Sequence, residues 1–225
     1  MYDIARQYDD PLDGAADQGG GGGGGVVFRT HSYVDAVYGV ANDVGLVFGE
    51  STCASRFVSR PVGFDRDGET GHALLDMAGV SKIALAWCVS ARCACHVMGQ
   101  LTETYGFYGE SPFATELRTL QQEGGEAISV VDKEEAWMFH LTSDPSGTSS
   151  LWAAQRVPEG HVAAASNQFV LREIDLTDPD NFMGSSNLAA VRKAQGVWNK
   201  DQSAVVPYEG CSVGLGAQGQ GQGQG

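Results

Sequence analysis

The sequence predicts an α+β fold in which antiparallel sheet is covered by helices. Strand-like segments rich in β-branched and aromatic residues come first, apolar residues at helical spacing follow over residues 74–105, and strand-like segments joined by short turns then return. Short links between consecutive strands, in place of the long crossovers of βαβ units, favour antiparallel pairing. A hydrophobic content of 42 % is enough for a packed core.

Both ends of the chain have compositions that do not form a core. Residues 1–25 are polar and end in seven consecutive glycines from Gly19, which predicts a flexible leader. Residues 216–225 alternate Gly and Gln and are expected to form a low-complexity tail. The folded domain is therefore expected over residues 26–215.

The first predicted strands form a hairpin. Residues 26–33 and 37–40 are rich in β-branched and aromatic residues, and the turn Asn42-Asp43-Val44-Gly45 separates residues 37–40 from residues 46–49.

A pair of helices is predicted between Leu74 and Tyr105. Ser90 lies between the two halves and is a suitable N-cap for the second helix. The apolar positions at helical spacing are Leu75, Ala78, Ile83, Leu85, Ala86, Ala94, Val97, Met98 and Leu101.

An antiparallel meander is predicted after Gly124 and Gly125. Its strands cover residues 127–131, 136–141, 151–156 and 162–169, and turn-forming residues separate them.

Charge and targeting signals exclude several classes of function. The chain has 14 basic and 28 acidic residues, and a formal charge of −14 repels phosphate backbones and anionic lipids. Nucleic acid and membranes are therefore not expected partners. The N-terminus is acidic where a signal peptide is basic and then apolar, and the five cysteines are an odd number. These features favour a reducing, cytoplasmic location.

Five ordered segments resemble one known family. Residues 38–52 read YGVANDVGLVFGEST, and further matches lie at residues 105–110, 134–137, 152–158 and 165–169, the last continuing into 172–175 and 180–183. On these segments the chain resembles the dipeptidase and secernin family of N-terminal-nucleophile cysteine hydrolases, from about Thr30 to about Gly196. Members of that family extend beyond both ends of this region.

The resemblance implies an αββα four-layer sandwich that hydrolyses dipeptides or short peptides. In the family a cysteine at the processed N-terminus attacks the peptide carbonyl, and its free α-amino group is the base. Because no cysteine precedes Cys53, we expect this chain to be an incomplete and inactive version. We expect no metal or other cofactor, since Cys88, Cys93, Cys95 and His96 fit no standard ligand spacing. The oligomeric state is left open.

The candidate site residues follow from the same resemblance. Asn167 resembles the Asn that related amidases place in the oxyanion hole, and Ser51, Thr52 and Glu50 are candidate substrate-binding residues. Arg156 and Arg172 are candidates for binding the carboxylate of a dipeptide, because a guanidinium offers a matching planar fork.

Other interpretations remain open at this point. Asn167 is also typical of a turn, Glu50 of a solvated carboxylate, and Trp137 and Trp152 of a hydrophobic core. A serine hydrolase using Ser51 with His31 or His72 is disfavoured, because no G-x-S-x-G elbow is present. The second candidate function is a non-catalytic, secernin-like scaffold that binds peptides or a protein.

Overall fold

The computed structural model describes residues 30–66, 68–109, 123–194 and 205–207. The predicted leader and tail lie outside these ranges, so the domain limits of 26 and 215 stay predictions. The strands are β1 (Tyr33–Asp35), β2 (Gly39–Asn42), β3 (Val47–Ala54), β4 (Asp65–Arg66), β5 (Glu69–Thr70), β6 (Glu123–Val131), β7 (Ala136–Ser143), β8 (Ser150–Arg156), β9 (Glu173–Asp175), β10 (Phe182–Gly184) and β11 (Val205–Pro207). The helices are α1 (Met77–Trp87), α2 (Ala91–Tyr105) and α3 (Leu188–Ala194).

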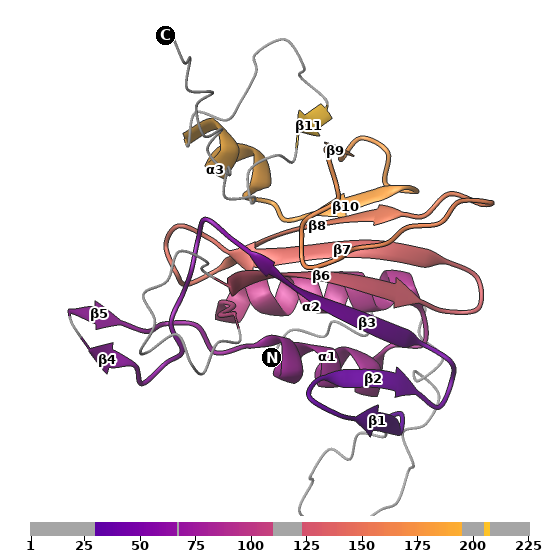
Figure 1. Cartoon of the computed structure of the whole chain (residues 1–225), viewed down its shortest axis with the longest axis horizontal. Coiled ribbons are helices and arrows are strands. Elements are labelled where there is room, and N and C mark those ends of the chain that lie inside the picture. Colours follow the sequence, from indigo (N-terminus) through magenta and orange to yellow (C-terminus); the bar gives the residue numbers. More distant parts are fainter. Residues whose placement is uncertain (1–29, 67, 110–122, 195–204, 208–225) are drawn as a thin grey trace, which may run out of the picture.

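Within the described ranges, one antiparallel sheet of seven strands organises the domain, in the order β1-β2-β3-β6-β7-β8-β10 (Figure 1). Its longest pairings are β3 with β6, β6 with β7, and β7 with β8. The predicted α+β class, the hairpin of residues 37–40 with 46–49 and three strands of the predicted meander are thereby confirmed. The predicted strand over residues 26–33 is not: β1 begins at Tyr33, residues 30–32 are not strand, and residues 26–29 lie outside the described ranges. The sequence reasoning did not predict β10, which extends the sheet beyond β8.

Helices α1 and α2 form the predicted helical hairpin and cover one face of the sheet (Figure 1). Ser90 is the N-cap of α2, and its hydroxyl accepts a hydrogen bond from the main-chain N–H of Cys93 at 3.2 Å. Asp76 caps α1 in the same way through the N–H of Gly79. No helix in the described ranges has both the length and the apolar character needed to cross a membrane.

The core between helices and sheet is built from the inner faces of α1 and α2 and from strand residues at alternate positions. Trp137 and Trp152 are 1 % and 3 % exposed and lie in this core, which confirms the interpretation of these tryptophans as core residues. Gly99 of α2 packs directly against the indole of Trp152, so the helix lies close to β8. The remaining large members include Phe48, Leu85, Met98, Phe107, Ile128, Phe139 and Leu141.

Hydrogen bonds from Asn42 and a disulfide hold the junction between α1 and α2. Asn42, at the end of β2, donates its side-chain amide to the carbonyls of Leu85 and Cys88 at 2.9 and 2.8 Å, and accepts from the N–H of Leu46. Cys88 and Cys93 are joined by a disulfide, a pairing that the cysteine count had not predicted. Buried Asn42 therefore ties the β2–β3 turn to the end of α1.

The predicted strand over residues 162–169 is wrong. These residues leave β8 and cross the face of the sheet that the helices do not cover; we call residues 165–171 the crossing segment. Val162 is 95 % exposed, whereas Phe169 and Leu171 are buried against the sheet. Of residues 162–169 only Val162 and Phe169 are strong strand formers, and Val162 is exposed, so the segment packs as irregular chain held by Phe169.

The second face of the sheet has its own small core. Cys53 of β3, Ala127 of β6 and Met138 of β7 pack there against Phe169 and Leu171 of the crossing segment. The same cluster also contains Leu151 and Ala153 of β8, Ile174 of β9 and Leu188 of α3.

Candidate functional site

Ser51, Glu50 and Thr52 lie within β3, which continues to Ala54 beyond the predicted strand of residues 46–49. Successive side chains of a strand point to opposite faces. Ser51 shares the second face with Cys53, whereas Glu50 and Thr52 lie on the helix-covered side with Phe48. There the Thr52 hydroxyl donates to a carboxylate oxygen of Glu50 at 2.8 Å. The strand therefore separates the three predicted substrate-binding side chains.

The structure brings Asn167 to Ser51 and Thr52. The main-chain N–H of Asn167 donates to Ser51 Oγ at 2.8 Å, and its Nδ2 donates to the main-chain oxygen of Thr52 at 3.0 Å. Asn167 has a φ of 51° and is exposed. No other non-glycine residue in the described ranges has a positive φ. Such conformations persist where the surroundings hold them, and they concentrate at functional sites.

His140 lies in the same row of the second face, and the sequence reasoning missed it. Register places Ser51 opposite Ala127, and Ala127 opposite His140, so two strand spacings, about 10 Å, separate Ser51 from His140. The imidazole accepts from the N–H of Val170 at 3.3 Å and contacts the ring of Phe169. Burial lowers the pKa of His140 from 6.5 to about 3, so the ring is neutral. Nothing in the sequence around His140 indicates that its ring accepts a hydrogen bond from Val170.

The two candidate arginines differ in position. Arg156 Nε pairs with Glu135 at 3.3 Å on the helix-covered side. The register aligns Thr52 of β3 with Trp152 of β8 across the sheet, and Arg156 lies four residues further along β8. With three strand spacings added, this places Arg156 about 20 Å from Thr52. The structure therefore does not bring Arg156 to the other candidates. Arg172 is exposed and directly follows the crossing segment.

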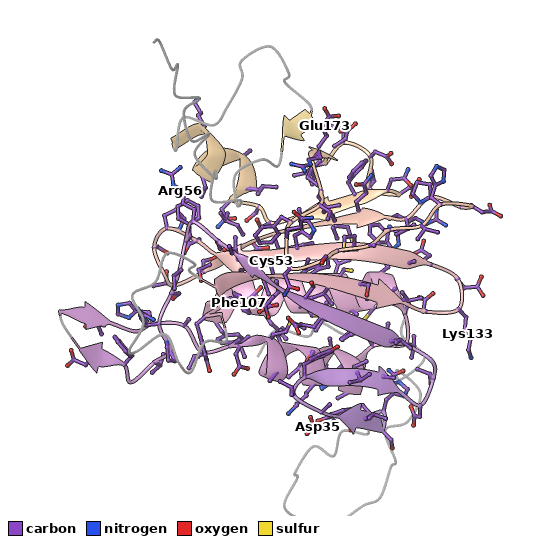
Figure 2. All side chains as sticks on the ribbon, in the orientation of Figure 1. Asp35, Cys53, Arg56, Phe107, Lys133 and Glu173 are labelled. Carbon is purple, nitrogen blue, oxygen red and sulfur yellow. A yellow bond between two sulfur atoms is a disulfide. The ribbon has the colours of Figure 1, made fainter. Side chains whose placement is uncertain are left out.

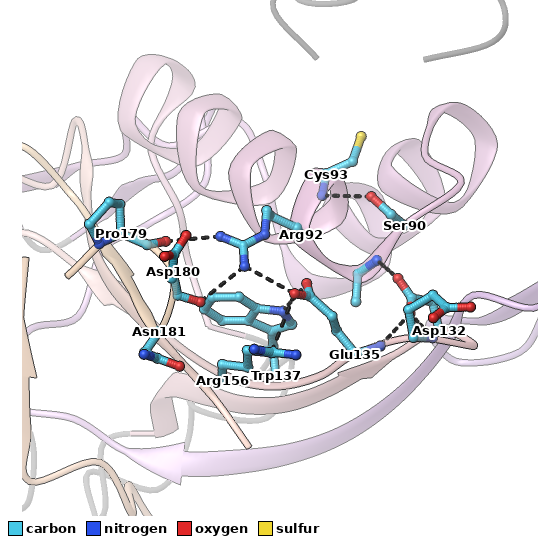
Figure 3. A network of polar contacts seen from close by, with 12 residues as sticks. Ser90, Arg92, Cys93, Asp132, Glu135, Trp137, Arg156, Pro179, Asp180 and Asn181 are labelled. Carbon is cyan, nitrogen blue, oxygen red and sulfur yellow. Dashed lines mark hydrogen bonds and ion pairs between the residues drawn. The ribbon is translucent and has the colours of Figure 1, made fainter. Parts of the chain in front are cut away.

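Glu135 belongs instead to a polar network at the start of β7 (Figure 3). Arg92 of α2 donates to Glu135 and to the carbonyls of Pro179 and Asp180, and its guanidinium lies 4.7 Å from the ring centroid of Trp137. Burial alone would raise the pKa of Glu135, but hydrogen bonds from Arg92 and Trp137 lower it. The network joins α2, β7 and the turn before β10, so its role is in the fold.

The described cysteines do not present a thiolate to solvent. Cys53 and Cys95 are fully buried, and Figure 2 shows Cys53 among the strands of the sheet. Burial also raises the pKa of Cys95 well above its ordinary value. Cys88 and Cys93 are held in the disulfide. Cys211 lies outside the described residues.

Other candidate chemistries gain no support from the geometry. His31 contacts Asp43 at 3.1 Å, and His72 lies in the loop after β5. The Ser51 hydroxyl accepts a hydrogen bond from the main-chain N–H of Asn167. No group of three or more His, Cys, Asp or Glu residues within the described ranges is arranged to hold a metal ion.

Comparison with known proteins decides the family. Residues 63–208, more than half of the chain, match the model of peptidase family C69. The chain belongs to peptidase family C69. The predicted relation to dipeptidases and secernins is thereby confirmed. The C69 match includes Asn167 and both candidate arginines, whereas the candidate residues of β3 precede it.

A curated relative supports the C69 assignment. A protein named probable dipeptidase, from Latilactobacillus sakei, is 27 % identical over 107 residues. The alignment covers 48 % of this chain and 18 % of the relative, so the chain corresponds to less than a fifth of that protein's length.

Proposed function

We propose that this chain is part of a cysteine-type dipeptidase of the N-terminal-nucleophile class, built on an αββα four-layer sandwich. Membership of family C69 and the likeness to a probable dipeptidase support this proposal. The observation that carries it is Asn167, an exposed amide held against β3 by two hydrogen bonds. The substrates are dipeptides or short peptides.

Asn167 has the chemistry that acyl transfer requires. When a thiolate attacks a peptide carbonyl, negative charge develops on the carbonyl oxygen, and a fixed amide N–H stabilises that charge. Removal of one such donor costs about 3 kcal/mol of barrier in comparable sites. Arg172 is the arginine adjacent to the crossing segment, and its planar fork suits the carboxylate of a dipeptide.

The nucleophile is assigned to a cysteine outside the described residues. Cys53 and Cys95 are buried, so attack on a substrate by either thiol would first require local unfolding. Cys88 and Cys93 are joined in a disulfide and would first have to be reduced. The described part of the chain is therefore proposed as the carbonyl-binding side of an incomplete site.

The test combines binding and cleavage of alanyl-alanine by the purified chain. We expect the dipeptide to bind, Asn167→Ala to weaken binding, and cleavage to be absent or unchanged by Cys53→Ala. Calorimetry measures the binding, and chromatography of released alanine measures the cleavage. Robust cleavage that Cys53→Ala abolishes would identify Cys53 as the nucleophile and contradict the proposal.

The burial of Cys53 and Cys95 favours a second candidate function, a non-catalytic scaffold that binds peptides. The two functions differ in one respect. When a longer form of the chain is assayed, the dipeptidase cleaves alanyl-alanine and loses activity with an alkylating reagent, whereas the scaffold binds the peptide without turnover.

A further inference from the structure

The main chain and the side chain of Asn167 are each held by a hydrogen bond to β3, at two neighbouring residues. Ser51 accepts the main-chain N–H, and the Thr52 carbonyl accepts one hydrogen of the side-chain amide. An amide nitrogen carries two hydrogens in a fixed plane. With one hydrogen on Thr52, the direction of the second is set by the strand. Because Asn167 is exposed, this second hydrogen is within reach of a ligand.

The rest of the crossing segment is anchored independently of Ser51. Phe169 is buried over Gly125 of β6, where a Cβ atom would collide with its ring. The N–H of Val170 donates to His140 of β7. The loss of the Ser51 hydroxyl therefore leaves the segment on the sheet and changes the local conformation of Asn167.

That local conformation needs support. A φ of 51° lies in the left-handed region, which asparagine tolerates but does not prefer. The bond to Ser51 acts on the main chain of Asn167, where this torsion is set. The bond to Thr52 is made by a main-chain oxygen and does not depend on the Thr52 side chain.

We propose that Ser51 is a positioning residue, which holds Asn167 in its left-handed conformation so that one amide hydrogen is directed at the carbonyl oxygen of a bound peptide. This inference rests on the proposed function. It gives Ser51 a role that differs from the predicted contact with substrate. It also makes Thr52 a matched control, because the two neighbouring residues touch the same Asn through different atoms.

The probe is the phosphinic analogue of alanyl-alanine, whose tetrahedral, negatively charged phosphinate resembles the intermediate of acyl transfer. Alanyl-alanine itself, with its planar amide, is the comparison ligand. Calorimetry on the full chain gives both dissociation constants, and neither measurement requires a nucleophile.

The variants have distinct expected effects. Asn167→Ala weakens binding of the analogue by about a hundredfold, and Ser51→Ala by about tenfold, because hydrogen bonds to charged groups are the strong ones. Ser51→Thr, which keeps the hydroxyl, restores most of the affinity. Thr52→Ala changes the affinity by less than about threefold. For alanyl-alanine the effect of Ser51→Ala is smaller, a difference that mere loss of structure would not produce.

A second measurement uses the wild-type chain and avoids any folding defect of a variant. With ¹⁵N-labelled asparagine, the two Nδ2 protons of Asn167 give separate resonances. We expect the analogue to shift one of them strongly, since the other is held by Thr52. Equal shifts of both protons, or no shift, would overturn the inference.

The outcomes separate the inference from the proposed function. If the wild-type chain does not bind the analogue, or Asn167→Ala binds it equally well, the proposed function fails. If Asn167→Ala weakens binding while Ser51→Ala behaves like Thr52→Ala, only the positioning role of Ser51 fails.

Discussion

The charge of His140 is set by where the sheet places it. The residue has no exposed surface, and its imidazole accepts a hydrogen bond from Val170. A neutral ring can accept this bond, whereas protonation would convert the accepting nitrogen into a donor. The crossing segment therefore depends on a histidine that stays unprotonated.

This dependence predicts the effect of pH on stability. The pKa of His140 is about 3 when folded and 6.5 ordinarily, so below pH 6.5 the unfolded chain takes up a proton that the folded chain does not. The contribution of neutral His140 to the free energy of unfolding is complete above pH 6.5 and is lost as the pH is lowered, by about 2 kcal/mol at pH 5. His140→Gln keeps an acceptor but cannot be protonated, and should remove this part of the loss. Urea unfolding at pH 7, 6 and 5 tests this, and parallel profiles for both proteins would contradict it.

At the scale of elements, the approach of α2 to β8 depends on the absence of a side chain at Gly99. A Cβ atom there would lie closer to the indole of Trp152 than real contacts allow. Helix propensity favours alanine over glycine by about 1 kcal/mol, but overpacking a core costs about 1–3 kcal/mol.

We therefore expect Gly99→Ala to lower the free energy of unfolding by about 1–2 kcal/mol, although alanine is the better helix former. In the double variant with Trp152→Phe, the smaller ring should relieve the collision and give a favourable coupling energy. Chemical denaturation of the four proteins of this cycle supplies the measurement. A stabilised Gly99→Ala would show that α2 moves away from the sheet without cost.

The network around Arg92 makes a second prediction at this scale. Arg92 joins α2 to Glu135 and to the carbonyls of Pro179 and Asp180, and stacks on Trp137 (Figure 3). Lysine keeps the charge but loses the planar fork and the stacking. Arg92→Lys should therefore destabilise the domain by about 1–2 kcal/mol in urea unfolding. The control is Arg172→Lys at an exposed position, expected within about 0.5 kcal/mol of wild type. Equal effects would contradict the role of the fork.

At the scale of the whole molecule, the formal charge of −14 dominates. A compact state concentrates like charges and is destabilised by their repulsion. We expect the unfolding temperature to rise when sodium chloride is increased from about 0.01 M to 0.15 M, which shortens the Debye length from about 30 Å to 8 Å. Thermal unfolding followed by circular dichroism measures it. A falling unfolding temperature would mean that pairs such as Lys82 with Asp35 outweigh the repulsion.

Local signals in the sequence predicted the helical hairpin and most of the sheet. The Ser90 cap and the apolar spacing on either side of it belong to a few neighbouring residues, and the structure follows them. Gly124 and Gly125 were read as a break but lie in β6, since Phe169 packs on the bare backbone of Gly125. Such a contact between distant segments leaves no local pattern.

The candidate site was predictable in part. The family resemblance selected Asn167, and no propensity or periodicity could have placed it on Ser51 and Thr52. The oxyanion role predicted for Asn167 remains a proposal, and the side chain of Thr52 lies on the other face of β3 from that of Ser51. Arg156 and Arg172 both carry a guanidinium that suits a carboxylate, but an ion pair with Glu135 holds Arg156 away from Ser51, Thr52 and Asn167. Side-chain chemistry indicates what a residue can bind, and only the topology decides which residues meet.

The bonds from Asn167 to β3 also bear on the order of folding. Asn167 and Ser51 are separated by 116 positions in the chain. A contact of such sequence separation carries a large loop-closure entropy and forms readily only after intervening structure has brought its partners together. Here β3, β6 and β7 must first pair, because Phe169 and Val170 dock on the last two. The proposed carbonyl-binding group is therefore completed late, and a partly folded chain would not bind its ligand.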